Sequence, residues 1–190
     1  MARTQAEDYG EKREAIVAEA AKLFALRGFD GASLAELAEA CGMSKSLFYH
    51  YYPSKEAILF AVMDSHIEAL LTALDAPPTD DPARALRDFA RRLLHLYAGA
   101  ADRQKVMLYD LARLSAPERR LIVAKERKLI SHVEALLASA DERAQEAELR
   151  AKTMLFFGML NWTHTWLKPG GGLSRDDVAD LAARTILERG

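Results

Sequence analysis

Residues 33–55 read SLAELAEACGMSKSLFYHYYPSK, and this stretch predicts two short helices joined by a tight turn. Ser33 and Glu36 have the spacing of a capping box, which begins the first helix, and Gly42 ends it. Ser44 is placed to cap the second helix, and Pro53 ends that helix because its ring does not fit a helix interior.

The second short helix has one face suited to a nucleic acid. Phe48 lies four residues before Tyr52, so this pair is expected to pack the helix onto its neighbour. The residues expected to face outward carry hydrogen-bond donors and no carboxylate: Lys45, Ser46, Tyr49 and His50. Phosphates are bound by cations and donors, base edges by short polar groups, and the major groove admits one helix. The stretch therefore predicts a helix-turn-helix.

The positive charge of this segment is local. Residues 40–55 contain two lysines, one histidine and no acidic residue, whereas the whole chain has 26 basic and 28 acidic residues and a net charge of −2. This balance argues against a polybasic protein that coats DNA without sequence preference. Lys55 begins the next helix, where it would bring a cation to backbone N–H groups suited to a phosphate.

A scaffold helix is predicted before the quoted stretch, from Glu11 to Arg27. Ile16, Ala20 and Phe24 recur at a spacing of four and give it one apolar face, and Gly28 ends it. The first ten residues are expected to form a loose polar arm.

The remainder of the chain predicts helices only, because it lacks the apolar-polar alternation of strands. Pro77, Pro78 and Pro82 mark a linker. Further helices are expected at 82–99, at 107–114, at 115–139, at 145–168 and after Ser174. Ser174 and Asp177 are placed to cap the last of these helices. The predicted fold is all-α, with a three-helix helix-turn-helix DNA-binding domain over residues 1–54 and a helical effector-binding and dimerisation domain over residues 55–190.

The expected helix at 145–168 is apolar nearly all round. Such a helix in a chain of 190 residues must be covered on several sides, and a second subunit is the natural cover for one of them. The sequence therefore predicts a homodimer with the last two helices at its interface.

The composition limits the cellular setting. Cys41 is the single cysteine and lies on the apolar side of its helix, so we expect a core thiol and no intramolecular disulfide. The polar, acidic N-terminus does not fit a signal peptide. The longest uninterrupted apolar run, Met154 to Leu160, has only seven residues, which is too short for a membrane span. We expect a cytoplasmic protein with no membrane partner.

The chain lacks the motifs that usually carry catalysis. It has no HExxH or cysteine-histidine metal spacing, no glycine-rich phosphate loop and no GxSxG elbow. We therefore expect no cofactor, no metal site, no catalytic residue and no enzymatic activity. The competing hypothesis, an enzyme that uses the helix-turn-helix as a targeting module, lacks a nucleophile or an acid-base pair.

Residues 23–59, LFALRGFDGASLAELAEACGMSKSLFYHYYPSKEAIL, resemble the signature of the TetR family of bacterial transcriptional repressors. The resemblance implies that the chain binds a double-stranded DNA operator, which we expect to be palindromic. It also implies a set of DNA-contacting residues: Ser33, Ser44, Lys45, Ser46, Tyr49, His50 and Lys55. Leu47 departs from the pattern, since many relatives have threonine or a small residue there, and it fits either a thymine methyl group or simple packing.

Residues 156–190 are similar to the end of a TetR subgroup that responds to coenzyme A thioesters. Asn161, Trp162, Trp166 and the Pro169-Gly170 turn carry this resemblance. It implies an acyl- or aryl-CoA thioester of a catabolic pathway as the effector. The alternative is that the tryptophans only fill the dimer interface.

Charge gives a second argument for such an effector. Residues 103–128 contain eight basic and three acidic residues, a local net charge of +5, and the phosphates of coenzyme A require cations. The tentative effector-binding residues come from an expected apolar tunnel, from this basic cluster and from the C-terminal motif. They are Phe89, Leu93, Tyr97, Met107, Leu111, Arg113, Phe157, Asn161, Trp162 and Trp166. Two alternatives stay open, namely i,i+4 ion pairs on a solvated helix and a lipophilic drug or cation held by Asp110.

Overall fold

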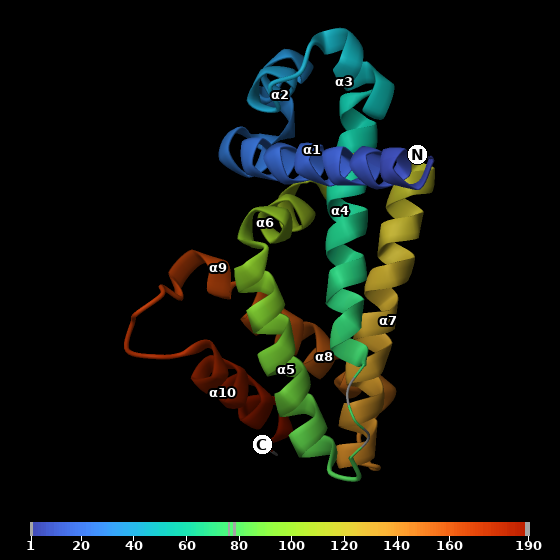
Figure 1. The fold of residues 1–190 in the computed structure, drawn as a ribbon. Coiled ribbons are helices and arrows are strands. Elements are labelled where there is room, and N and C mark those ends of the chain that lie inside the picture. The colour runs from blue at the N-terminus through green and yellow to red at the C-terminus, as the bar shows by residue number, and fades with distance from the viewer. Residues whose placement is uncertain (1, 76, 78, 189–190) are drawn as a thin grey trace. The chain divides into compact units, whose positions relative to one another are not determined.

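The structure is a computed structural model that describes residues 2–75, 77 and 79–188, with side chains from Asp8 onward. Every regular element in these ranges is helical, which confirms the all-α prediction (Figure 1). In chain order the elements are α1 (Ala2–Gly31), α2 (Leu34–Ala40), α3 (Lys45–Tyr51), α4 (Lys55–Leu71), η1 (Thr72–Leu74), α5 (Pro82–Gly99), α6 (Ala101–Asp110), η2 (Leu111–Arg113), α7 (Ala116–Ala140), α8 (Glu146–Asn161), α9 (Thr163–Trp166) and α10 (Arg175–Leu187).

The helices form two compact units. The N-terminal unit contains Met1–His66 and Asp102–Ile122, and the C-terminal unit contains Ile67–Ala101 and Val123–Gly190. The long helices α4 and α7 each contribute residues to both units, so neither unit is one continuous piece of chain.

The core of α1 follows the predicted apolar face. Ile16, Ala20 and Phe24 are buried, and Gly28 interrupts the helix at a φ of 73°, a backbone conformation that favours glycine. The expected loose arm was wrong, because α1 begins at Ala2. The ion pair between Lys12 Nζ and Asp8 Oδ2, 2.8 Å long, supports this added part of the helix.

Both helices of the helix-turn-helix have the predicted N-terminal caps. The Ser33 Oγ accepts a bond from the Glu36 N–H at 3.2 Å, and the Glu36 Oε2 accepts one from the Ser33 N–H at 2.9 Å. Hydrogen bonding with the Ser33 side chain, and then with the Ser33 N–H, lowers the pKa of the Glu36 carboxyl. The Ser44 Oγ accepts the Leu47 N–H at 3.2 Å, and Gly42 turns the chain between the helices at a φ of 63°. The tight turn of the sequence prediction is confirmed.

A buried polar pair joins α4 to α6 in the N-terminal unit. His66 is 1% exposed, and its Nε2 lies 2.7 Å from the Oε1 of Gln104. Burial is the main cause that lowers the pKa of the His66 imidazole, which favours the neutral form of the ring. Its Nδ1 has no hydrogen-bond partner among the described residues.

Among the residues that the structure describes, one helical stretch, Lys55–Leu74, is long and apolar enough to cross a membrane. The mean hydropathy of its most apolar 18-residue window is 1.6. A search for uninterrupted apolar runs misses this stretch because polar residues are interspersed in it. Its residues Ile58, Leu59, Val62 and Met63 are fully buried in the structure. A buried core helix passes the same test of length and hydropathy.

In the C-terminal unit, α5 packs against α10. Leu86, Phe89 and Leu93 are fully buried, and small side chains such as Ala179 and Ala183 allow the close approach of α10. Polar bonds hold the outer edge of this pair, since the guanidinium of Arg91 donates two bonds of 2.6 Å to the Asp180 carboxylate, and His95 Nε2 lies 2.8 Å from Asp176 Oδ1.

The expected helix at 145–168 is divided in two. Helix α8 ends at Asn161, and the single turn α9 follows after Trp162. The Thr163 Oγ1 donates to the Leu160 carbonyl at 2.7 Å, and the Thr165 Oγ1 donates to the Trp162 carbonyl at 2.8 Å. Side chains that bond to nearby carbonyls in this way compete with the helix ladder, so the helix does not continue unchanged to Lys168.

Candidate functional site

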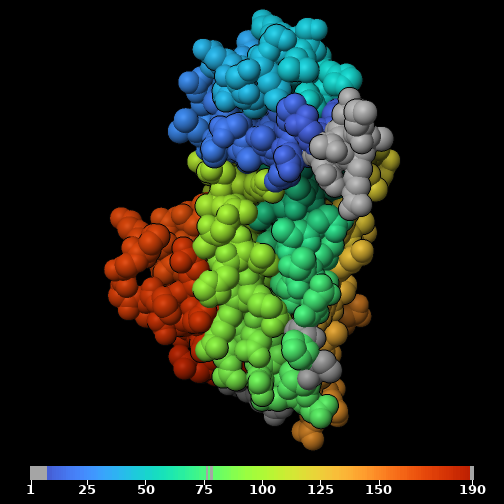
Figure 2. All heavy atoms as spheres, in the orientation of Figure 1, coloured from blue at the N-terminus to red at the C-terminus, as the bar shows by residue number. Residues whose placement is uncertain are grey.

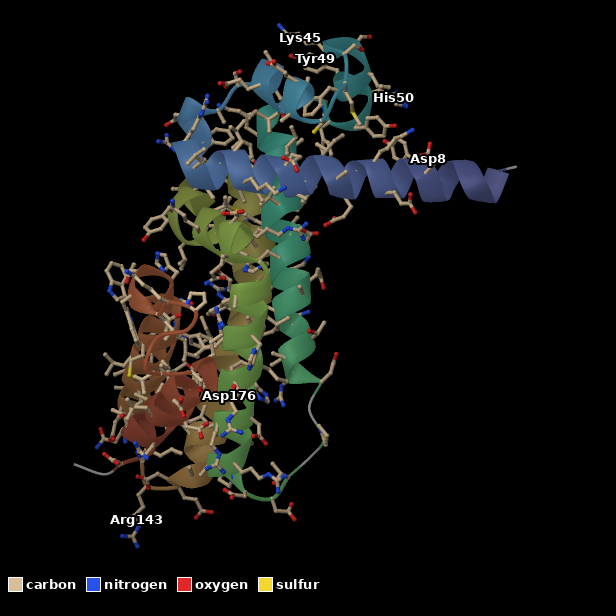
Figure 3. The ribbon with its side chains drawn as sticks, turned by 60° about the vertical axis from the view of Figure 1, so that its left-hand side comes forward. Asp8, Lys45, Tyr49, His50, Arg143 and Asp176 are labelled. Carbon is tan, nitrogen blue, oxygen red and sulfur yellow. The ribbon has the colours of Figure 1, made fainter. Side chains whose placement is uncertain are left out.

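The outward face of α3 is the surface that the sequence analysis singled out. Its side chains predicted to face outward are exposed, with half of the Tyr49 side chain accessible, while Phe48 and Tyr52 are buried as predicted. Figure 2 shows α2 and α3 uncovered at the surface of the N-terminal unit, and Figure 3 shows Lys45 extending away from α1. This face offers an ammonium, hydroxyls and an imidazole.

Leu47 lies on the same exposed face. Nearly half of its side chain is accessible, so it does not serve as core packing within the N-terminal unit. Contact with a thymine methyl group, the other role left open by the sequence, stays a prediction.

The early turns of α1 support α3 in a way that the sequence analysis missed. The ring of Tyr9 stacks on Tyr51 with 4.9 Å between centroids, and its centroid is 6.0 Å from that of His50. Arg13 lies 4.8 Å above the ring of Tyr52 and donates from Nε to the Tyr52 hydroxyl at 3.4 Å. The spacing of four between Tyr9 and Arg13 fits a helical face, whereas the predicted loose arm includes Tyr9.

Ser33 and Ser44 are exposed at the starts of α2 and α3. Each hydroxyl oxygen accepts a backbone N–H as a cap, which leaves its hydrogen available to donate elsewhere. The capping role and the predicted phosphate contact are therefore compatible at both positions.

Lys55 has a structural role that the sequence did not indicate. Its Nζ donates to the carbonyl of Phe29 at 2.8 Å and to that of Ala32 at 3.0 Å, and it lies 4.2 Å from the centroid of the Phe29 ring. Two of its three donors are thus used within the N-terminal unit. The predicted phosphate contact stays a prediction, with one donor left to make it.

The ten tentative effector-binding residues are divided between the two units. Phe89, Leu93, Tyr97 and Phe157 are buried in the C-terminal unit, where the rings of Phe89 and Phe157 meet edge to face at 6.5 Å. The same unit holds the half-buried Asn161 and the exposed Trp162 and Trp166, while Met107, Leu111 and Arg113 belong to the N-terminal unit. Within the C-terminal unit, only the buried aromatic and leucine side chains form a common core.

Several cations of the basic stretch 103–128 are paired with carboxylates in their own unit. Arg103 pairs with Glu14, Arg113 with Asp30 at 2.5 Å, and Lys125 with Glu68 at 2.6 Å. These pairs reduce the positive charge available to a ligand. That this stretch holds the phosphates of coenzyme A stays a prediction, and its available positive charge is smaller than the count of basic residues indicates.

Glu126 is a polar residue that the sequence analysis did not single out. It follows the buried Ile122 by four residues on α7 and precedes the buried Leu129 by three, so it lies on the core side of the helix. Burial raises the pKa of its carboxyl. The sequence could have indicated this residue, because Glu126 is an acidic residue on an otherwise apolar helix face. Asp110, the carboxylate considered in the sequence analysis, has its pKa raised by the same cause.

Cys41 is half-buried rather than fully in the core. Burial raises the pKa of its thiol, which lowers the fraction of reactive thiolate. Its surroundings therefore do not favour a redox switch.

Comparisons with known proteins agree with this arrangement. The chain matches two family models, "Bacterial regulatory proteins, tetR family" over residues 16–62 and "Tetracyclin repressor-like, C-terminal domain" over residues 79–189. The chain belongs to the TetR family. Both family descriptions refer to regulators and neither refers to an enzyme.

Two solved structures are similar to this chain over nearly its whole length. A TetR-family transcriptional regulator from Bordetella parapertussis 12822 is 36% identical, with a TM-score of 0.84 and coverage of 93% of this chain and 94% of that one. AibR, solved in complex with isovaleryl coenzyme A and operator DNA, is 28% identical, with a TM-score of 0.79 and coverage of 92% and 97%.

A curated relative is the uncharacterized HTH-type transcriptional regulator YuxN of Bacillus subtilis (strain 168). It is 30% identical over 142 residues, which are 71% of this chain and 48% of YuxN. The chain thus spans about half of that relative's length.

The structural role of Lys55 predicts a loss of stability when the ammonium is removed. Lys55→Met should lower the free energy of unfolding by about 1–3 kcal/mol, because the Phe29 and Ala32 carbonyls lose a charged donor. Chemical denaturation followed by circular dichroism measures this. Lys45→Met, which changes an exposed lysine in the same unit, should shift the free energy by less than about 0.5 kcal/mol. Equal effects of the two substitutions would show that the Lys55 bonds contribute nothing.

Proposed function

We propose that this chain is a DNA-binding transcriptional repressor that releases its operator when a small molecule binds. The observation that carries the proposal is the exposed face of α3, which bears donors and no carboxylate in a chain of the TetR family. We assign DNA binding to residues 1–54 and effector binding with dimerisation to residues 55–190, and we place the protein in the cytoplasm.

On this proposal, α3 enters the major groove. Lys45, Ser46, Tyr49 and His50 face base edges and phosphates, while Ser33, Ser44 and Lys55 contact phosphates from helix starts. AibR, whose solved complex includes operator DNA, supports DNA binding for a relative of the same fold. The stacking of Tyr9 on Tyr51 would hold the inner side of α3 while the outer side meets DNA.

We propose a homodimer formed through α8 and α10. An apolar stripe along α8 and its C-cap residue Trp162 is exposed in the single chain, with 63% of Leu155 and 61% of Trp162 accessible, and Met154 and Gly158 belong to the same stripe. Leu181 extends the apolar surface onto α10, which packs against α8. Two such chains related by a two-fold axis would present two α3 helices to half-sites about 34 Å apart, which fits a palindromic operator.

For the effector we propose an acyl- or aryl-CoA thioester. AibR binds isovaleryl coenzyme A in its solved complex, and the C-terminal unit offers a buried aromatic core around Phe89 and Phe157 that suits an acyl or aryl group. Effector binding would favour a dimer geometry that fits the operator less well, so release would be a population shift.

One observation favours a second effector class. The half-buried carboxylate of Glu126 lies on the core side of α7 in the C-terminal unit, where a lipophilic cation would compensate its charge. A multidrug-type repressor is therefore the alternative to the thioester. The enzyme with a DNA-targeting module remains the least supported proposal.

The DNA-binding proposal is tested with an operator selected by the wild-type protein from a random duplex library. Tyr49→Ala and Lys45→Ala should each weaken binding by about tenfold or more, and Lys45→Ala should also reduce the salt dependence by about one phosphate contact. Fluorescence anisotropy with the selected duplex measures both effects.

The matched control is Tyr109→Ala, which removes another exposed tyrosine of the N-terminal unit and should leave the affinity unchanged. If Tyr109→Ala and Tyr49→Ala weaken binding equally, α3 is not the reading helix. Failure to select any duplex would contradict DNA binding itself.

The dimer proposal predicts that a charge on the α8 stripe separates the subunits. Leu155→Glu should give a monomer at micromolar concentration, because a carboxylate would be buried without a partner in the interface. Sedimentation velocity measures the mass. Leu121→Glu, which places the same charge at another exposed leucine, should leave the dimer intact, and a wild-type protein that sediments as a monomer would refute the interface.

The effector proposal predicts release of the selected duplex by isovaleryl coenzyme A and not by isovalerate. A thioester that favours the released state should reduce operator affinity by about tenfold at saturation. Anisotropy titration of the complex with each compound, with free coenzyme A and with a lipophilic cation separates the classes. Release by the cation alone would replace the thioester with the alternative effector.

A further inference from the structure

A cavity of about 350 Å³ lies in the C-terminal unit, and none of the tentative effector-binding residues of the sequence analysis lines it. Its walls come from η1, from the chain before α5, and from α5 and α7. The side chains that decide its chemistry are Arg84, Asp88 and Arg92 of α5 and His132 of α7, with Leu74 and Leu136 as apolar walls.

A hydrogen bond to the backbone holds the guanidinium of Arg92 in place. Its Nε donates to the Ala73 carbonyl at 3.1 Å, which fixes the guanidinium plane and leaves its two terminal nitrogens. Among the described residues no carboxylate forms an ion pair with Arg92. The neighbouring Arg91, in contrast, has its donors directed to Asp180. A half-buried guanidinium without an acidic partner is suited to an oxyanion, which accepts two parallel bonds.

His132 supplies a second donor in the same cavity. Its ring lies against Phe89, with 5.0 Å between centroids, so the imidazole is held by packing. Burial, with a smaller effect from Arg92, lowers the pKa of the His132 ring. A neutral imidazole still has one N–H to donate.

The remaining charges leave the cavity positive. Arg84 lies 3.7 Å from Asp88, a long and exposed i,i+4 pair that leaves most of its donors unused. Two guanidinium groups therefore face one carboxylate, and the cavity has a net charge of +1 when His132 is neutral. An anion is the ligand that balances this charge.

We propose that this cavity binds the oxyanion group of a small molecule, a phosphate or a carboxylate. Arg92 forms the bidentate contact, His132 donates one further bond, and Arg84 adds positive charge at the opening. The position of His132 against Phe89, which in turn meets Phe157, places the cavity beside the buried aromatic core. Its assignment to the anionic part of the effector rests on the proposed function, whereas anion binding itself does not.

The test is a calorimetric titration of the DNA-free protein with three probes: inorganic phosphate, isovalerate and coenzyme A. At least one probe should bind to the wild-type protein. Arg92→Ala should weaken that binding by roughly ten- to a hundredfold, the usual effect of losing a charged hydrogen-bond pair, and Arg92→Lys should restore part of it. Phosphate and coenzyme A without isovalerate identify a phosphate site, and isovalerate alone identifies a carboxylate site.

Two further variants keep the result independent of folding. His132→Phe retains the ring against Phe89 and removes only the donor, and it should weaken binding by about three- to tenfold. Arg87→Ala removes an exposed arginine of α5 that does not line the cavity, and it should change the affinity by less than about twofold. Circular dichroism and the thermal midpoint show that each variant is folded.

Each result has one meaning. No binding of any probe to the wild-type protein, or equal losses in Arg92→Ala and Arg87→Ala, overturns the proposed anion site. Binding that depends on Arg92 without any change in operator affinity establishes the anion site and refutes its link to the effector. Operator release that is unaffected by Arg92→Ala leads to the same conclusion.

Discussion

The helix-turn-helix of this protein depends on how the chain leaves α1. Gly28 breaks the helix at a positive φ, and the residues after it leave carbonyl groups that no longer continue a regular ladder. Lys55, the first residue of α4, donates to two of these carbonyls, at Phe29 and Ala32. One side chain therefore joins the end of α1, the approach to α2 and the start of α4.

A second bond network continues from this junction into α2. Glu36 completes the capping box with Ser33 and also pairs with Arg27 of α1. The direction of α2 is thus fixed by its own cap and by the preceding helix. The turn at Gly42 then sets the orientation of α3 relative to α2. The burial of Phe48 and Tyr52 then leaves Lys45, Ser46, Tyr49 and His50 at the surface, so the outward face of α3 is a consequence of the junction and the turn.

Local patterns predicted most of this fold. The capping boxes at Ser33 and Ser174, the cap at Ser44 and the start of α5 at Pro82 all depend on residues within a few positions, and the structure has each of them. The loose arm and the long helix 145–168 were wrong for a different reason. Tyr9 stacks on Tyr51, which lies far away in the sequence. The end of α8 depends on a hydroxyl group, that of Thr163, which donates a hydrogen bond to a nearby carbonyl.

The polar side chains of the C-terminal unit show where sequence reasoning ends. Residues 84–92 contain four arginines of identical intrinsic chemistry, and the structure gives them different surroundings: Arg91 binds Asp180, Arg92 binds the Ala73 carbonyl, Arg84 lies near Asp88, and Arg87 is exposed. The 3.6-residue period indicates which side of α5 each one occupies, but the partner on that side comes from α10 or η1. A count of basic residues therefore overestimated the stretch 103–128, where several cations are paired, and overlooked Arg92. In this fold a cation is available to a ligand only where tertiary packing supplies no carboxylate. Whether it does depends on two elements that pack together, and not on the sequence of one helix.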